Sequence, residues 1–407
     1  MYTVPFALRR PFLLARDVMV DRDRPDLRRL SDISDPEHFV WAILPHAART
    51  FSACIALLPG RAARVAAVAY LYCRMLDTYE DLLEAASERE EALRSFGERF
   101  GASVRGPRAS KAGSSATVPD GPRAAAGAVG TAAPASGAAR AKAAGLLAAP
   151  RIAEGRGRDL RDATHLLLVE RHALVDRVYL TLAQRERELI QTLVHDMSEG
   201  MRWSSATFHR QSGVLENEAQ LARYCRNVLG HPVRFASRLL RLCQVGDAGL
   251  PEQVGRDAMT VGEMVQLANV TRDIEKDLRR GIAYHPLLKE DLGRSVDGDA
   301  DLVERVRVVR EQLLLMALRR APAYRRLVEF VSPRPLSLAR ASAVLMMLFT
   351  DRYFRSCARR AGRAVWGGRR AGVRLILEAL PAACSRRWAR RVLCGIEQDF
   401  LRAAALA

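Results

Sequence analysis

The sequence lacks the features of a zinc-binding, secreted or membrane-spanning protein. Its seven cysteines include no C-x-x-C pair, and its eight histidines show no H-x-x-x-H spacing, so a structural zinc site is not expected. The N-terminal apolar stretch is interrupted by arginines and has no small-residue cleavage site, which argues against a secretory signal. No window reaches about 18 uninterrupted apolar residues. We therefore expect a cytoplasmic protein with reduced, buried thiols.

Aromatic residues are also scarce, at 6%, and no segment alternates as a half-buried strand would. Ala, Leu and Arg dominate, and these are strong helix formers. With 49% hydrophobic residues, the chain of 407 residues can bury a sizeable core. The sequence therefore predicts an all-α protein. A formal net charge of +18 suits nucleic acid, an anionic membrane surface or phosphorylated small molecules, and does not choose among them.

The N-terminal half contains one segment of different composition. A helical pattern begins at Asp35 and Pro36, which suit a cap and a first turn, so residues 1–34 are an N-terminal extension. A further helix is expected from about Ala62 to Arg99. Residues at about 101–157 are rich in Ala, Gly, Ser and Pro, which predicts a disordered insertion within one domain. An interdomain linker is the alternative.

Helical periodicity resumes near Asp162, with breaks expected at Ser204–Gly213, Gly246–Gly255 and Val331–Pro335. Residues 366–407 form a C-terminal helical extension that mixes basic and apolar side chains. Packing of this extension against the other helices is the main expectation. Contact with an anionic membrane surface is the alternative, so the protein is cytoplasmic with peripheral membrane association left open.

The first chemical signal is a group of carboxylates in AYLYCRMLDTYEDLLE, residues 69–84. Asp77, Glu80 and Asp81 share one helix face because positions i, i+3 and i+4 are neighbours on that face. Arg74 and Tyr70 occupy the two preceding turns. A strongly apolar run leads directly into Asp77, where a solvated acidic face is not expected.

The second signal is MVQLANVTRDIEKDLRRGIAYHP, residues 264–286. Asp273 and Asp277 are one turn apart, with Asn269 and Gln266 on the preceding turns. Either motif alone is typical of a solvated face, but the repeated arrangement favours a site. Mg²⁺ prefers oxygen ligands and is usually held by one or two carboxylates plus substrate phosphates. Two facing acidic helices would thus promote departure of a diphosphate, and an apolar cavity would protect the carbocation from water.

These motifs resemble those of the squalene and phytoene synthase family. DTYED, with its upstream Tyr and Arg, looks like the family's first aspartate-rich motif, and QLANVTRDIEKD looks like the second. The following GIAYHP is similar to the family's G-x-x-Y-x-P. HAARTFSACIALLP resembles the segment that closes over substrate, matched at Arg49 and Phe51. The similarity covers roughly residues 40–365 without the insertion.

The resemblance implies a single isoprenoid-synthase helical bundle over residues 35–365, with a central cavity that takes prenyl diphosphates and Mg²⁺. It assigns three groups of residues by analogy. The implied metal ligands are Asp77, Glu80, Asp81, Asp273 and Asp277; the implied substrate-binding residues are Arg49, Phe51, Val228, Gln266, Asn269 and Arg272; and the implied catalytic residues are Tyr70, Arg74 and Tyr224. Among these, Tyr224 is the candidate to steer or accept the proton lost when a cyclopropane forms.

The implied reaction joins two farnesyl diphosphates head to head through a cyclopropylcarbinyl diphosphate, which NADPH would reduce to squalene. Phytoene or dehydrosqualene formation without reduction is the alternative, although DTYED is closer to the squalene synthase form. Two departures bear on the product. Leu229 and Val233 replace small residues in YCRNVLGHPV, where Pro232 is inserted, and Ala358 stands where a lysine is usual in the segment credited with NADPH binding.

Two other classes of protein stay open. A head-to-tail prenyltransferase or terpene cyclase would share the metal chemistry, but neither the doubled D-D-x-x-D pair nor N-x-x-x-S-x-x-x-E is present. A basic helical nucleic-acid-binding or scaffold protein would need a basic stripe interleaved with aromatic residues. The arginines are scattered instead, so no nucleic-acid partner is expected.

Overall fold

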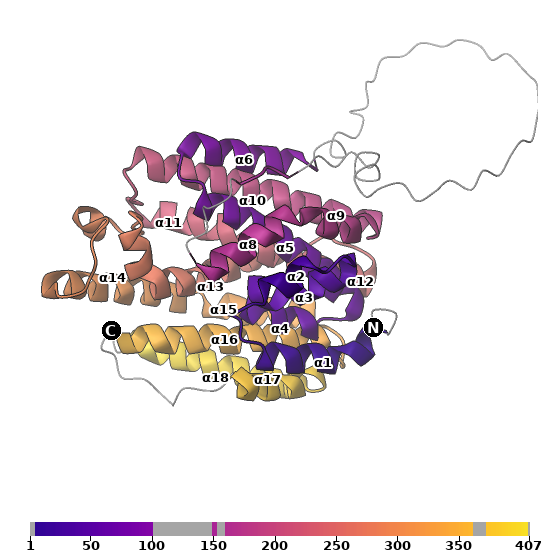
Figure 1. Ribbon diagram of the computed structural model, residues 1–407. Coiled ribbons are helices and arrows are strands. Elements are labelled where there is room, and N and C mark those ends of the chain that lie inside the picture. Colours follow the sequence, from indigo (N-terminus) through magenta and orange to yellow (C-terminus); the bar gives the residue numbers. More distant parts are fainter. Residues whose placement is uncertain (1–4, 101–148, 153–158, 361–371, 406–407) are drawn as a thin grey trace, which may run out of the picture.

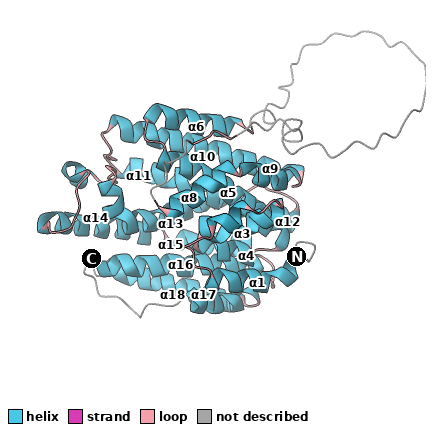
Figure 2. Ribbon diagram, viewed as in Figure 1, coloured by secondary structure: helices cyan, strands magenta, loops and turns pink. Residues whose placement is uncertain are grey.

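The computed structural model describes residues 5–100, 149–152, 159–360 and 372–405. Within these ranges the chain is helical, and the one β contact is an isolated bridge between Val214 and Ala283. Figure 1 shows a layered bundle with α6 and α10 on one side and α16, α17 and α18 on the other, and Figure 2 shows helix in every layer. The predicted all-α fold is confirmed. The elements are α1 (Phe6–Met19), α2 (Leu27–Ser31), α3 (Pro36–Ala48), α4 (Thr50–Leu57), α5 (Gly60–Leu82), α6 (Ala86–Glu98), α8 (Leu160–Glu170), α9 (His172–Leu180), α10 (Gln184–Arg210), α11 (Glu218–Cys225), the π-helix η1 (Arg226–Gly230), α12 (His231–Val245), α13 (Glu252–Arg279), η2 (Pro286–Asp291), α14 (Ala300–Leu318), α15 (Ala321–Val331), α16 (Leu338–Arg360), α17 (Gly372–Ala379), η3 (Leu380–Ala383) and α18 (Arg386–Ala405).

The start of α3 follows its local sequence. The side chain of Asp35 accepts a hydrogen bond from the backbone N–H of His38 at 2.6 Å, and Pro36 occupies the first turn, where its missing N–H costs nothing. The later breaks at Gly246 and Val331 also occur. Gly246 ends α12 with φ 74°, a left-handed conformation that glycine adopts without strain.

Two predicted boundaries were wrong. The helix expected from Ala62 to Arg99 is broken between Leu82 and Ala86, where Leu83 is extended at φ −90° and ψ 113°. Tertiary contacts hold this break: the Leu83 side chain is buried, and the Arg89 guanidinium donates both to the Leu83 carbonyl at 3.0 Å and to the Ser205 hydroxyl of α10 at 3.3 Å. The break expected at Ser204–Gly213 begins later than Ser204, since α10 runs on to Arg210 and is capped at Gln211.

The π-helix η1 explains how Pro232 is accommodated. A proline inside a regular helix removes one backbone hydrogen bond and clashes with the carbonyl four residues earlier. Here the wider π turn at Arg226–Gly230 ends just before Pro232, which lies in the first turn of α12. Such π turns are frequent at functional sites. This one carries Val228 and Leu229, which line the cavity described below.

Close packing between η1 and α13 depends on two glycines. A Cβ atom added to Gly262 of α13 would lie 2.4 Å from the backbone N and Cα of Gly230. No side chain fits in that space, so the two backbones approach directly. The contact fixes η1, with its cavity-lining residues, against the helix that carries the second acidic motif.

The insertion expected at about 101–157 lies outside the described residues except for 149–152. There the Tyr79 hydroxyl donates to the Pro150 carbonyl at 2.7 Å, and the Ala149 N–H donates to His172 Nε2 at 3.3 Å.

In the C-terminal extension, α17 and α18 pack against α16. All seven cysteines lie in described ranges as free thiols; Cys384 is exposed, contrary to the expectation of burial.

Candidate active site

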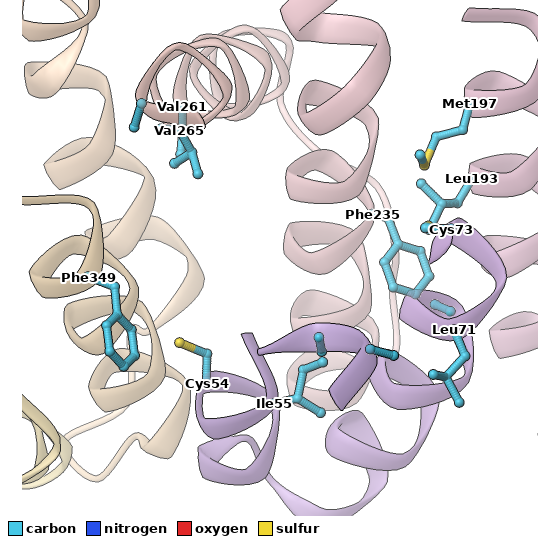
Figure 3. Packing of buried hydrophobic residues seen from close by; sticks show 14 of the residues in the cluster. Cys54, Ile55, Leu71, Cys73, Leu193, Met197, Phe235, Val261, Val265 and Phe349 are labelled. Atoms are coloured by element: carbon cyan, nitrogen blue, oxygen red, sulfur yellow. The ribbon is translucent and has the colours of Figure 1, made fainter. Parts of the chain in front are cut away.

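A cavity of about 1230 Å³ lies at the centre of the bundle, bounded by α4, α5, α10, α12, α13 and α16. Small-molecule sites usually measure about 300–1,000 Å³, so this one has room for more than one ligand chain. Apolar side chains line it toward the N-terminal parts of α5 and α13. Figure 3 shows several of these residues: Cys54 and Ile55 on α4, Phe235 on α12, Val261 and Val265 on α13, and Phe349 on α16.

Polar side chains line the other end of the cavity, where the C-terminal parts of α5 and α13 meet. The Arg280 guanidinium, just after α13, donates to Asp81 Oδ1 of α5 at 2.9 Å and so joins the two acidic segments. The structure brings every site residue predicted from the sequence to this cavity. They are Arg49, Phe51, Tyr70, Arg74, Asp77, Glu80, Asp81, Tyr224, Val228, Gln266, Asn269, Arg272, Asp273 and Asp277.

The carboxylates at this end are paired with arginines. Asp77 Oδ2 lies 3.2 Å from Arg74 Nη1, and Arg74 Nη2 donates to the Tyr70 hydroxyl at 3.1 Å. Asp273 receives two parallel hydrogen bonds from Arg272, at 2.8 Å and 2.5 Å. Such bidentate guanidinium groups recognise diphosphate oxygens equally well. A bound diphosphate can therefore accept the hydrogen bonds of these arginines in place of the carboxylates. The carboxylates are then available to bind a cation.

Burial and mutual repulsion raise the pKa values of these carboxyl groups. The pKa of Glu80 rises to about 8, through burial and then repulsion by Asp81 and Asp77. The pKa of Asp277 rises to about 6, through burial and then repulsion by Asp273. The pKa of Asp77 is also raised by burial, although Arg74 opposes the shift. At Glu80 and Asp277 the neighbouring arginines therefore do not fully offset burial and carboxylate repulsion.

The donor set fits Mg²⁺ when substrate is bound with it. The donors are hard carboxylate oxygens, which Mg²⁺ prefers. Within the described ranges, no three His, Cys, Asp or Glu side chains are grouped so as to hold a metal ion. An ion here would use one or two carboxylates from either helix and complete its shell with diphosphate oxygens and water. A bound cation would offset the burial and repulsion that raise the pKa values of Glu80 and Asp277.

Stability is expected to depend on pH and Mg²⁺ together. Because Glu80 and Asp277 have raised pKa values in the folded state, the metal-free protein binds extra protons and loses stability as pH rises from about 4 to about 8. Mg²⁺ with inorganic diphosphate relieves that repulsion. The rise in Tm on adding both should be at least about 2 °C larger at pH 8 than at pH 6. Thermal unfolding at the two pH values measures this, and equal gains would contradict it.

Two tyrosines, Tyr224 (buried) and Tyr284 (partly buried), connect the apolar and acidic parts of the cavity. The hydroxyls of Tyr224 and Tyr284 are 3.4 Å apart, and the Tyr284 hydroxyl donates to Asp277 Oδ2 at 3.2 Å. Since Tyr284 uses its proton on Asp277, Tyr224 is the donor in the first pair. Burial holds the pKa of both phenols well above 10, so both are neutral. The chain from Tyr224 to Asp277 is a route along which a proton can pass.

Arg49 occupies a strained backbone position between α3 and α4. Its φ of 51° lies in the left-handed region, which costs a non-glycine residue about 1–3 kcal/mol. Strain of this kind collects at functional sites because the surrounding structure must enforce it. The Arg49 side chain lines the cavity and its guanidinium lies 3.0 Å from Asp23.

Sequence reasoning missed several cations in the cavity. Lys276 and Arg280 lie within the second motif, and the spacing of Lys276 from Asp273 was a signal that could have placed it on the acidic face. Arg161 of α8 gave no local signal, since only the fold brings it there. Within the described residues it has no ion pair or hydrogen bond, and burial together with Arg74 and Arg49 lowers its pKa.

An unpaired, half-buried arginine in an anion-binding cavity is expected to contribute to diphosphate binding. Arg161→Ala should raise KM for the prenyl diphosphate about fivefold, with a smaller change in kcat. Arg177→Ala, on the exposed face of α9, is the matched control and should leave both constants unchanged. Steady-state kinetics of the two variants measures the effect, and an unaltered KM for Arg161→Ala would refute it.

The segment that resembles an NADPH-binding region spans residues 354–365, and its described part, residues 354–360, lies beside the second acidic motif. Arg360 Nη1 donates to the Arg272 carbonyl at 3.1 Å, while Ala358 is buried in the core. Residues 361–365 of this segment lie outside the described ranges.

Among the helices that the structure describes, none has the length and apolar content needed to cross a bilayer.

Comparison with known proteins agrees with this geometry. A complex of TcSQS with the ligand BPH1237 has a TM-score of 0.61 at 16% identity, covering 91% of this chain and 99% of that one. A complex of TcSQS with E5700 has a TM-score of 0.56 at 17% identity, covering 91% and 98%. A dehydrosqualene synthase in complex with ligand has a TM-score of 0.48 at 15% identity, covering 87% and 98%.

The two TcSQS likenesses show that the fold is shared. No curated protein matches this chain significantly in sequence. The family model for squalene/phytoene synthase matches residues 44–375, which include both acidic motifs, the α4 segment and the tyrosine pair. The chain therefore belongs to the squalene/phytoene synthase family.

Proposed function

We propose that this chain joins two farnesyl diphosphates head to head and, with NADPH, converts the product to squalene. The observation that carries the proposal is the cavity itself. One end gathers carboxylates and arginines from two helices, and the other is an apolar space larger than a single small ligand requires. This arrangement suits ionisation of a diphosphate at one end while two hydrocarbon chains are held side by side.

The first half-reaction begins with loss of diphosphate from the donor. Mg²⁺ bound with substrate would supply charge neutralisation for that departure. Arg74 and Arg272 hold the diphosphate oxygens as their bonds to Asp77 and Asp273 are exchanged. The double bond of the acceptor then attacks the allylic cation, and loss of one proton closes the cyclopropane. The products are a cyclopropylcarbinyl diphosphate, one diphosphate and one proton.

The tyrosine chain is suited to take up that proton. The Tyr224 oxygen accepts it while passing its own hydrogen to Tyr284, and Tyr284 passes its hydrogen to Asp277. Asp277 is the end point of this chain because its carboxylate accepts the hydrogen bond from Tyr284. Tyr224 thereby stays neutral throughout, as its burial requires.

The second half-reaction ionises the cyclopropylcarbinyl diphosphate and rearranges the carbon skeleton. Hydride from NADPH then reduces the final cation to squalene, and NADP⁺ and a second diphosphate are released. The apolar lining from α4, α12, α13 and α16 keeps water away from both cations.

One observation favours a second candidate, the non-reducing product dehydrosqualene or phytoene. Ala358 replaces a lysine that is usual in the family's NADPH segment, and it is buried at 2% exposure. No charged group at that position is available for a nicotinamide cofactor. In this case the final cation loses a proton instead of gaining hydride.

The decisive experiment is product analysis. Purified protein is incubated with farnesyl diphosphate and Mg²⁺, with and without NADPH, and the lipids are identified by mass spectrometry. Squalene formed only with NADPH supports the proposal. Dehydrosqualene under both conditions supports the second candidate. Turnover that survives EDTA, or a head-to-tail product, would overturn both, since diphosphate departure from this site needs charge neutralisation.

A further inference from the structure

Helix α4 is held between the cavity and the N-terminal helix α1. Its cavity side is formed by Phe51, Cys54 and Ile55, at the i, i+3 and i+4 positions of one helix face. Figure 3 shows Cys54 and Ile55 on the helix that borders this space. Ser52 and Ala56 belong to the opposite face, where α1 packs. Helix α1 precedes residue 44, so it lies outside the region that the family model matches.

A buried hydrogen bond joins the two helices at the first turn of α4. Asp17 Oδ1 of α1 accepts from the Ser52 hydroxyl at 3.0 Å, and the two residues are 2% and 1% exposed. Asp17 Oδ2 is buried without a hydrogen-bond partner among the described atoms, and the nearest cation is Arg16 Nη2, 3.8 Å from Oδ1. A carboxylate this poorly compensated costs stability, and a common use of such groups is to fix one arrangement of neighbouring elements.

A second anchor lies at the other end of α4. The Arg10 guanidinium donates to the carbonyls of Ala56 at 3.1 Å and Leu58 at 2.9 Å. The last carbonyls of a helix have no partner within it, and a cation there also complements the helix dipole. Arg10 thus satisfies the C-terminal end of α4 from α1.

A third contact reaches the strained residue at the start of α4. Asp23, in the segment after α1, lies 3.0 Å from the guanidinium of Arg49. This pair is exposed and weak by itself. Together with Asp17 and Arg10, however, it means that the N-terminal segment contacts α4 at its beginning, its first turn and its end.

We propose that α1 positions α4, and with it Arg49 and Phe51, for ligand binding, and that Asp17 is the principal positioning residue. The ligand part rests on the proposed function and on Arg49 as a substrate-binding residue, the role that the family resemblance implies for this cavity-lining side chain. Without the Asp17 bond, α4 samples other positions, and only the fraction of molecules with Arg49 in place binds tightly. The apparent affinity falls by that fraction, whereas the chemical step in the bound state changes little.

Kinetics of variants in the full-length protein test the ligand part. Asp17→Ala should raise KM for farnesyl diphosphate about fivefold, equivalent to about 1 kcal/mol, with kcat changed less than about twofold. Asp17→Asn keeps an acceptor for Ser52 and should restore KM. Asp257→Asn is the matched control, because Asp257 is a buried carboxylate of α13, 4% exposed, that does not line the cavity. It should lower stability without changing KM.

Hydrogen exchange of the ligand-free protein separates this proposal from the proposed function. Amides of residues 50–57 should exchange about fivefold faster in Asp17→Ala and in Arg10→Gln than in wild type, and not in Asp257→Asn. That result supports positioning by α1 even if the product assay fails. Unchanged exchange in α4, or an increase in Asp257→Asn equal to that in Asp17→Ala, would overturn the proposal even for an active squalene synthase.

Discussion

Asp77→Ala and Asp273→Ala are each expected to lower kcat/KM by at least about 1,000-fold while leaving the helical circular-dichroism signal intact. This loss is about 4 kcal/mol of transition-state stabilisation, the size expected when one ligand of a charge-neutralising site is removed. Both side chains line the cavity and neither is part of the apolar core. Removing one carboxylate leaves Arg74 or Arg272 without its present partner, so diphosphate binding can persist although turnover stops.

The matched control is Glu91→Ala. Glu91 lies on the exposed face of α6, is paired with Arg94 and does not line the central cavity. Its replacement should change neither activity nor fold by a measurable amount, as is usual for exposed ion pairs. Near-normal turnover in Asp77→Ala or Asp273→Ala would show that the carboxylates are not metal ligands. Loss of the helical signal would show that they support the fold instead.

Local spacing predicted the acidic faces because a helix brings i, i+3 and i+4 residues together whatever surrounds it. The resemblance to a known family then added Arg49, Phe51 and Val228, which spacing alone would not have selected. Arg161 could not be found in either way. It follows the long Ala/Gly-rich segment and reaches the cavity only because α8 packs on α5.

The errors in helix boundaries also arise from tertiary packing that the local sequence does not reveal. Nothing in Leu83, Glu84 or Ala85 forbids a helix, and the break there depends on Arg89 and on burial of Leu83. Propensity is a weak prior that tertiary contacts override. Conversely, Pro232 signals a break locally, yet the π turn before it keeps η1 and α12 in one continuous wall of the cavity.

The wall formed by η1 and α12 is expected to limit the length of the substrate chain. Leu229 and Val233 both line the cavity, on η1 and on α12, at positions where the family resemblance implies smaller residues. They narrow the space beside the reacting chains. The wild-type enzyme should therefore prefer the C15 farnesyl donor over the C20 geranylgeranyl donor. Replacing Leu229 by Ala and Val233 by Gly removes several methyl-sized groups, each worth about 0.8 kcal/mol of contact or steric effect.

The double variant should lower the C15-to-C20 ratio of kcat/KM by at least about tenfold, because 1.4 kcal/mol corresponds to a factor of ten. Val245→Ala provides the control: Val245 ends the same helix α12, is 58% exposed and does not line the cavity, so the ratio should stay as in wild type. An unchanged ratio in the double variant would mean that these side chains do not limit chain length. A wild type that already prefers the C20 donor would move the assignment to phytoene synthase, because the cavity would then hold two C20 chains despite Leu229 and Val233.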